Sequence, residues 1–96
     1  MKAVRLHPAA QAELLSATDW YLARSEGAAA NFVHEVEHAI ARIGESPERY
    51  PVTRFSRRRF VLLNFPFDIV YRIVGAEVEI IAIAHHARRP GYWRGR

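Results

Sequence analysis

The residues best suited to bind something negatively charged lie in the second half of the chain. Arg57, Arg58 and Arg59 open an apolar run, and the sequence closes on Arg88-Arg89-Pro90-Gly91-Tyr92-Trp93-Arg94. Arginine pairs with phosphate or carboxylate through two parallel hydrogen bonds and stacks on planar groups. Two interpretations are open: a solvated basic face, or a contact surface for nucleic acid or an acidic partner protein.

The charge is distributed unevenly between the two halves of the chain. Residues 1–50 carry five Lys/Arg and seven Asp/Glu, a net of −2, whereas residues 51–96 carry nine Arg and three Asp/Glu, a net of +6. The two halves sum to the formal net charge of +4. The positive charge therefore gathers in the half whose sequence is typical of strands.

A second pattern with chemical meaning is His34-Glu35-Val36-Glu37-His38, which matches the zinc-protease pattern H-E-x-x-H. The helical period places both histidines away from the apolar residues Phe32 and Val36, on the solvent side. A catalytic zinc also needs a third ligand and a cleft. We therefore expect solvated histidines here, with no metal and no cofactor.

His85 and His86 are adjacent at the end of an expected strand, so they should point to opposite faces of the sheet. One metal ion is not easily bound by two such neighbours. We interpret them as hydrogen-bonded structural histidines, one of them on the exposed face beside Arg72.

Length and composition describe one small domain over residues 1–96, with a flexible basic tail over about 87–96. Half of the residues are hydrophobic and there is no cysteine, which excludes a disulfide-stapled scaffold. The sequence shows no apolar run of about 18 residues and no signal-peptide pattern, so we expect no membrane contact and a cytoplasmic location.

The apolar periodicity predicts two helices and four strands. Helical spacing covers 9–24 and 28–43, with Gly27 as the stop of the first helix and Gly44 and Pro47 ending the second. Strand patterns cover 3–6, 58–64, 67–74 and 77–85, and Gly75-Ala76 suits a type II′ turn.

The expected order is β-α-α-β-β-β. We expect an α+β fold in which an N-terminal antiparallel helix hairpin packs on a small antiparallel sheet. Arg72 shares one strand face with Val70 and Val74, so that face should not be the main core.

Several segments together resemble the ParE branch of the RelE/ParE toxin superfamily. They are Phe65–Ile73, Ile80–His85, Arg88–Trp93, His7–Ala10 opening a helix hairpin, and Ser46-Pro47 closing it. The resemblance implies the same α+β fold and the toxin of a type II toxin–antitoxin module. It also implies a cognate antitoxin whose C-terminal segment wraps the toxin, and operator DNA bound only indirectly, through the antitoxin.

The superfamily contains two mechanisms. RelE-like members are ribosome-dependent mRNA endoribonucleases, and their basic residues correspond here to Arg59 and Arg88, with Tyr92 near their terminal tyrosine. Val61 and Asp68 stand where those enzymes carry further basic residues. Because a carboxylate repels a scissile phosphate, Asp68 argues against a nuclease; if this chain is one, the catalytic candidates are Arg59, Arg88 and Tyr92.

ParE-like members instead inhibit DNA gyrase by binding, and this is the function we expect. The resemblance and the residue types suggest one contact surface for gyrase and another for the antitoxin. The gyrase-facing candidates are Arg88, Arg89, Tyr92, Trp93 and Arg94. The antitoxin-facing candidates are Arg57, Arg58, Arg59 and Arg72.

Two other readings stay open at this point. One is that Tyr92 and Trp93 fold back to cap the small core. An inactive member retained for antitoxin-linked autoregulation is the remaining functional alternative.

Overall fold

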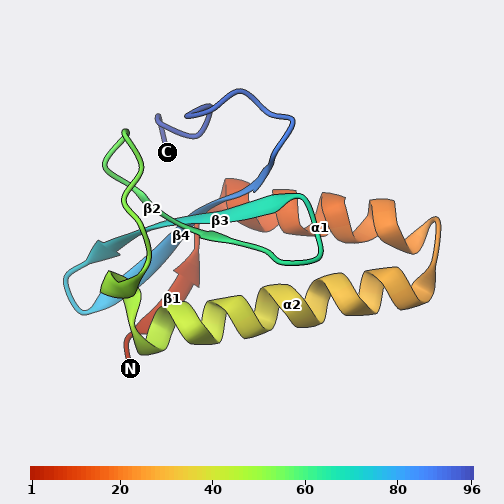
Figure 1. Cartoon of the computed structure of the whole chain (residues 1–96), viewed down its shortest axis with the longest axis horizontal. Coiled ribbons are helices and arrows are strands. Elements are labelled where there is room, and N and C mark those ends of the chain that lie inside the picture. The colour runs from red at the N-terminus through yellow and green to blue at the C-terminus, as the bar shows by residue number, and fades with distance from the viewer.

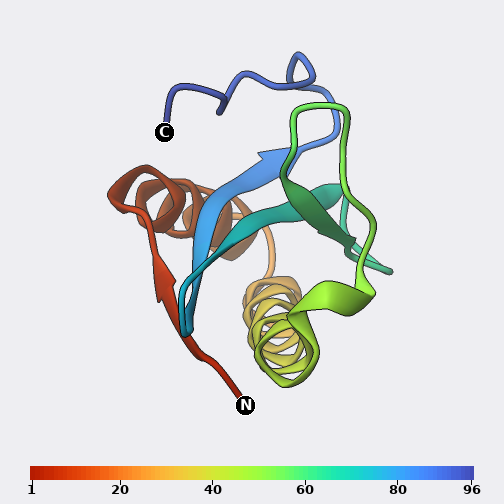
Figure 2. The same ribbon diagram turned by 90° about the vertical axis from the view of Figure 1, so that its left-hand side faces the viewer.

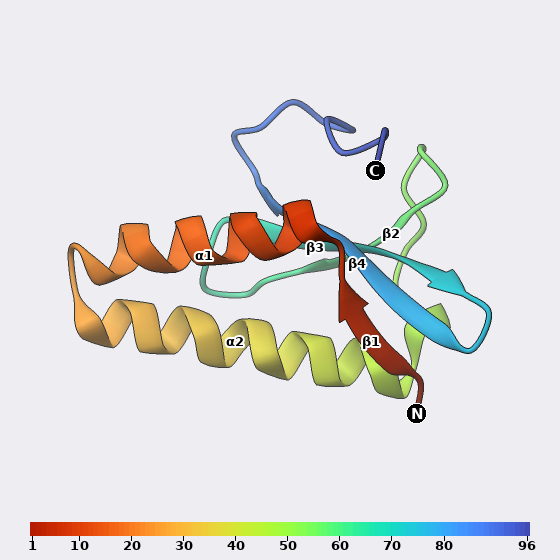
Figure 3. The same cartoon turned by 180° about the vertical axis from the view of Figure 1, so that it is seen from behind.

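The computed structural model describes all 96 residues, and its elements follow the order β-α-α-β-β-β (Figure 1). Two long helices lie side by side along one face of a four-stranded sheet (Figure 3). The elements are β1 (Ala3–Leu6), α1 (Pro8–Leu22), α2 (Glu26–Glu45), a short 3₁₀ turn η1 (Pro47–Arg49), β2 (Arg58–Val61), β3 (Phe67–Val74) and β4 (Glu77–His85). No helix combines the length and the apolar character that a membrane span needs.

The sheet is mixed, with strand order β1-β4-β3-β2. The β2–β3 and β3–β4 pairs are antiparallel, as expected, but β1 runs parallel to β4, with Leu6 opposite Ile80. The expectation of an antiparallel sheet therefore holds for three strands and is corrected for β1. At the β3–β4 turn Gly75 has φ 61 and Ala76 keeps a negative φ, the combination that a type II′ turn needs.

Both helices begin at residues that satisfy a free backbone N–H. The His7 ring accepts a hydrogen bond from the Ala9 N–H at 3.0 Å, and Pro8 occupies the first turn, where a missing N–H costs nothing. Ser25 caps α2 by accepting from Ala28 at 3.2 Å. Gly27 was expected to end the first helix; that was wrong, because the serine cap starts α2 at Glu26 and places Gly27 inside it.

The main core lies between the helix pair and the sheet. The helices contribute Phe32, Val36 and Ile43, and Tyr71 is the largest fully buried side chain of the strands. The Tyr71 hydroxyl donates to the Pro47 carbonyl at 2.5 Å, so the core also fixes η1. Burial, opposed in part by nearby Arg58, raises the pKa of Tyr71 to about 12.

A smaller second core lies on the opposite face of the sheet. A register shift between Val70 and Tyr71 leaves one extra residue on β4, so Ile81 and Ala82 both face away from the helices. Trp93 packs on them and is only 5% exposed. Figure 2 shows the C-terminal segment arching over this face, away from α2.

The segment over 87–96, expected as a flexible basic tail, contributes Trp93 to this second core. The segment leaves the sheet after His85, as expected, but it returns through a series of turns. The Trp93 ring meets Phe55 edge-on at 5.7 Å, and Gly91 adopts φ 77 where a Cβ would lie 2.6 Å from the Phe55 ring. The tail and the loop before β2 thus close the second core together.

Candidate interaction groove

A groove of about 720 Å³ opens on the face of the sheet that the helices leave uncovered. The loop at 51–55 contributes one bank of the lining, the tail at 88–93 contributes the other, and the ends of β2, β3 and β4 contribute the floor. We call it the basic groove. Its charged and titratable lining residues are Arg54, Arg59, Asp68, His85, His86, Arg88, Arg89 and Tyr92.

Asp68 stands on the floor of the basic groove and is already paired. Its Oδ1 lies 2.8 Å from His86 Nε2, and its Oδ2 lies 3.6 Å from Arg59. Strand register explains both contacts, because Asp68 sits opposite Val61 on β2 and Ala84 on β4. The single carboxylate in the basic groove is therefore shared between two groups that can carry positive charge.

The two adjacent histidines point to opposite faces, as predicted. His85 accepts from the Ala87 N–H at 3.0 Å, and its ring lies edge-on to Phe67 of the main core, 4.9 Å away. One of the two histidines was expected beside Arg72; the one on the exposed face, His86, lies instead beside Asp68.

Three arginines around the groove stack on aromatic rings. The Arg88 guanidinium lies 3.9 Å from the Tyr92 ring centre, and Arg54 and Arg94 lie 4.9 and 4.8 Å from Phe55. Such stacking holds a guanidinium plane without neutralising its charge. No carboxylate lies within ion-pair distance of Arg54, Arg88, Arg89 or Arg94.

The Tyr92 hydroxyl is hydrogen-bonded to Glu13 of α1. It donates to Glu13 Oε2 at 2.7 Å. Burial and this hydrogen bond, with the Glu13 charge, raise the pKa of Tyr92 well above its usual range. Arg96 adds two hydrogen bonds to the same carboxylate, at 2.8 and 2.9 Å. Tyr92 is thus a neutral donor that anchors the tail.

Of the four arginines predicted to face the antitoxin, Arg58 and Arg72 are engaged by contacts within the fold. Arg58 donates to the carbonyls of Glu48 and Tyr50 at 3.0 and 2.7 Å, so it holds the loop before β2. Arg72 donates to Glu79 at 2.8 and 2.7 Å.

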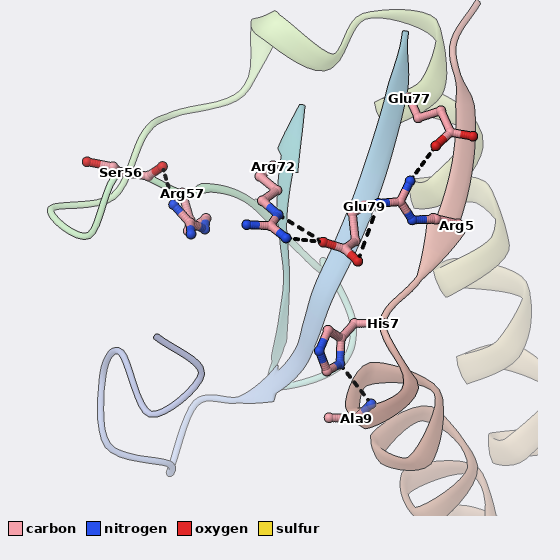
Figure 4. A network of polar contacts seen from close by, with 8 residues as sticks. All are labelled: Arg5, His7, Ala9, Ser56, Arg57, Arg72, Glu77 and Glu79. Carbon is pink, nitrogen blue, oxygen red and sulfur yellow. Dashed lines mark hydrogen bonds and ion pairs between the residues drawn. The ribbon is translucent and has the colours of Figure 1, made fainter. Parts of the chain in front are cut away.

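Glu79 in turn lies 3.6 Å from Arg5, which also pairs with Glu77 on the edge of the sheet (Figure 4). Arg72 is therefore one member of a ladder of alternating charges across β3, β4 and β1. Arg57 contacts only the carbonyl of Ser56, at 3.3 Å, and Arg59 is half exposed. Arg57 has no carboxylate partner, and Arg59 is held only by its 3.6 Å contact with Asp68, so both guanidinium groups are accessible to a partner.

The H-E-x-x-H pattern has a structural use that the sequence did not reveal. His34 and His38 are exposed, as predicted. Glu35 accepts hydrogen bonds from the backbone of Leu63 and Asn64, at 2.6 and 3.1 Å, and from the Asn64 side chain at 2.9 Å. These bonds outweigh partial burial and lower the pKa of Glu35. Through these hydrogen bonds Glu35 fixes the β2–β3 connection to α2.

The structure brings Arg59, Arg88, Arg89, Tyr92 and Trp93 to the basic groove. Sequence reasoning missed Glu13 and the pairing of Asp68 with His86. Glu13 gave no local signal, because its partners lie about seventy residues or more away along the chain. The pairing with His86 was not readable from the turn either, because residue 84 comes opposite Asp68 only through the register shift between Val70 and Tyr71.

Two helices on a mixed four-stranded sheet, with a basic groove on the far face, define a small two-layer α+β protein of the kind that the sequence resemblance implies. The family model described as "ParE toxin of type II toxin-antitoxin system, parDE" matches residues 4–90. The chain therefore belongs to the ParE toxin family, and it is a ParE-type toxin of a type II toxin–antitoxin system.

A solved structure has the same fold. It is described as the chromosomal ParDE TA system from P. aeruginosa, and it matches with a TM-score of 0.71 and 20% sequence identity, over 88% of this chain and 96% of that one. A comparison with curated proteins gives no match. The α+β fold in the predicted element order is thereby confirmed.

Proposed function

We propose that this toxin inhibits DNA gyrase by binding to it, and that a cognate antitoxin neutralises it. The observation that carries the proposal is the ParE family match over residues 4–90. Two features of the groove support binding rather than chemistry. Tyr92 is fixed as a neutral donor, and a carboxylate occupies the floor, where the negative charge that develops during phosphodiester cleavage would need a positive group.

The gyrase contact in this proposal consists of Arg88, Arg89 and Arg94, which project from the tail and are exposed. Trp93 was a further candidate for this contact. Because it is 5% exposed, we assign it the role of support beneath the three arginines. Tyr92 is half-buried and acts with it. Because Arg58 and Arg72 are engaged within the fold, we restrict the proposed antitoxin contact to Arg57 and Arg59.

One observation favours a second function, cleavage of mRNA. Arg59, Arg88 and Tyr92, the three candidates for a ribonuclease, line the same groove, and His86 lies there with Asp68 holding its Nε2. The remaining ring nitrogen of His86 is then a candidate proton acceptor for an attacking hydroxyl. In this second function Asp68 orients the His86 ring instead of repelling the scissile phosphate.

Pulse labelling after induction of the toxin in a bacterial host without antitoxin separates the two functions. We expect thymidine incorporation to fall before methionine incorporation. If methionine incorporation falls first, the target is translation and the gyrase proposal fails. If neither falls, the chain is the inactive, autoregulatory member of its module.

The contact residues are tested with a variant that leaves Trp93 in place. Replacing Arg88, Arg89 and Arg94 together with alanine should abolish the growth defect while purified antitoxin still binds. The matched control replaces Arg24, Arg42 and Arg49, which lie on the helix side and carry the same total charge. Equal toxicity of both variants would remove the tail from the gyrase contact.

A further inference from the structure

The basic groove carries more positive charge than its own fold uses. Around it, Arg54, Arg88 and Arg89 have no carboxylate partner, and only Asp68 offers negative charge. Asp68 is 16% exposed and already lies beside Arg59 and His86. A ligand entering the groove therefore meets unpaired guanidinium groups from both banks.

The arrangement of these arginines suits a chain of repeated negative charges. Arg54 comes from the loop bank, and Arg88 and Arg89 come from the tail bank, so a linear ligand lying between them is contacted from two sides. Arg54 and Arg88 are held against aromatic rings, at 4.9 and 3.9 Å. A guanidinium fork held in this way binds two phosphate oxygens at low entropic cost.

The groove lacks the aromatic anchor that dominates most protein interfaces. The Phe55 and Trp93 rings pack on each other, and Tyr92 is tied to Glu13. The only large apolar lining side chains that are well exposed are Val52 and Val61. Charge is the principal recognition element, which favours a nucleic-acid backbone over an acidic protein.

We propose that the basic groove binds the phosphate backbone of a single DNA strand directly. The groove is small, about 720 Å³, and a single flexible strand can follow a small basic groove along its backbone. The only side-chain carboxylate of the groove is already engaged, so no free carboxylate is left to accept from a 2′-hydroxyl. The groove therefore reads phosphate rather than sugar. The proposal does not depend on gyrase being the target.

The test is fluorescence anisotropy of a labelled single-stranded DNA oligonucleotide titrated with the purified toxin alone, over a range of salt concentrations. With three or four phosphates neutralised, log K should fall against log salt with a slope of about −2 to −3. The double variant Arg54→Ala/Arg89→Ala should lose affinity at low salt and reduce the slope by about 1.4.

The control Arg24→Ala/Arg42→Ala lowers the formal net charge by the same two units, from +4 to +2, on the helix side. It should retain the affinity and the slope. If both double variants weaken binding equally, the effect is one of overall charge and the groove is not the site. Arg54→Lys/Arg89→Lys keeps the charge without the fork and should recover part of the affinity.

Two further titrations close the test. An RNA strand of the same sequence should bind within about threefold of the DNA; binding more than tenfold tighter would show that the sugar is read and contradict the proposal. Polyglutamate should compete weakly. If it displaces the oligonucleotide at equal charge concentration, the groove is a site for acidic protein, and the proposal is overturned. None of these results requires gyrase, so they leave its inhibition to be judged separately.

Discussion

At the scale of single residues, Glu13 joins three parts of the chain. Beyond Leu6 the edge of β4 has no strand partner, and Glu13 accepts the Ile83 N–H at 3.0 Å in place of one. The same carboxylate accepts from Tyr92 and from Arg96. One side chain of α1 therefore satisfies a strand edge and holds the tail.

Replacing Glu13 with glutamine tests this role. The amide has one acceptor oxygen and no charge, so the charge-assisted bonds to Arg96 are lost. We expect the free energy of unfolding to fall by about 1.5–3 kcal/mol, measured by urea denaturation. Glu37→Gln, on the exposed side of α2, is the control and should stay within about 0.5 kcal/mol of the parent. A similar small change for Glu13 would mean that the tail is not anchored there.

The raised pKa of Tyr71 predicts that the stability of the fold decreases at alkaline pH. Its pKa of about 12 in the folded chain lies above its ordinary value of 10.0. Between these values the unfolded chain ionises while the folded chain does not, so stability should be constant below pH 10 and decline up to about pH 12.

The measurement is unfolding by urea at several pH values above neutrality. Tyr71→Phe should remove the part of the decline that belongs to this residue. It should also lower stability at neutral pH by about 1–3 kcal/mol, because the Pro47 carbonyl loses its buried partner. An unchanged pH profile in this variant would assign the decline to Tyr92 and Tyr21, whose pKa values are also raised.

At the scale of elements, the strands were the most predictable part. The bounds of β1, β3 and β4 match the apolar runs of the sequence, because Gly75-Ala76 and Pro66 punctuate them clearly. The second strand was predicted to 64 but ends at Val61, since Glu35 binds the backbone of the next residues from α2. That contact joins residues 28 apart, which no local pattern encodes.

The second core could not be predicted for a related reason. Strict alternation along β4 would put Ile81 and Ile83 on one face, but the extra residue at the register shift sends them to opposite faces. The apolar run from Ile80 to Ala84 has no alternation that would reveal the shift. The tail folds back because this unpredicted face is apolar and needs a cover.

The two tryptophans offer a matched test of that cover. Trp93→Ala removes a side chain that is 5% exposed and should cost about 3–5 kcal/mol of stability. Trp20→Ala removes one that is 54% exposed and should cost far less. Thermal unfolding followed by circular dichroism compares them. Equal effects would show that the tail does not stabilise the sheet, and truncation after Ala87 should then also be tolerated.

At the scale of the whole molecule, the charge separates along the two layers. The helix half of the sequence is net −2 and the strand half net +6. The loop and the tail that carry the free arginines lie on the sheet side opposite α2 (Figure 2). A field of this kind accelerates the approach of acidic partners, and salt screens it.

The association rate with the proposed antitoxin should therefore fall by about tenfold or more between low salt and physiological ionic strength. Stopped-flow fluorescence measures it directly. Arg57→Ala/Arg59→Ala should flatten this dependence, whereas Arg24→Ala/Arg42→Ala should leave it unchanged. A rate that is insensitive to salt would mean that the antitoxin is recognised through apolar contacts.

The position of Glu13 also bears on how this toxin behaves at high concentration. A strand edge with open N–H groups recruits strands from other molecules and seeds insoluble assemblies. Here one carboxylate blocks the edge of β4 and is itself held by the tail. Detachment of the tail should therefore convert a monodisperse toxin into one that self-associates, and light scattering of Glu13→Gln at rising concentration would reveal it. We therefore expect the anchored C-terminus to protect the edge of β4 against aggregation.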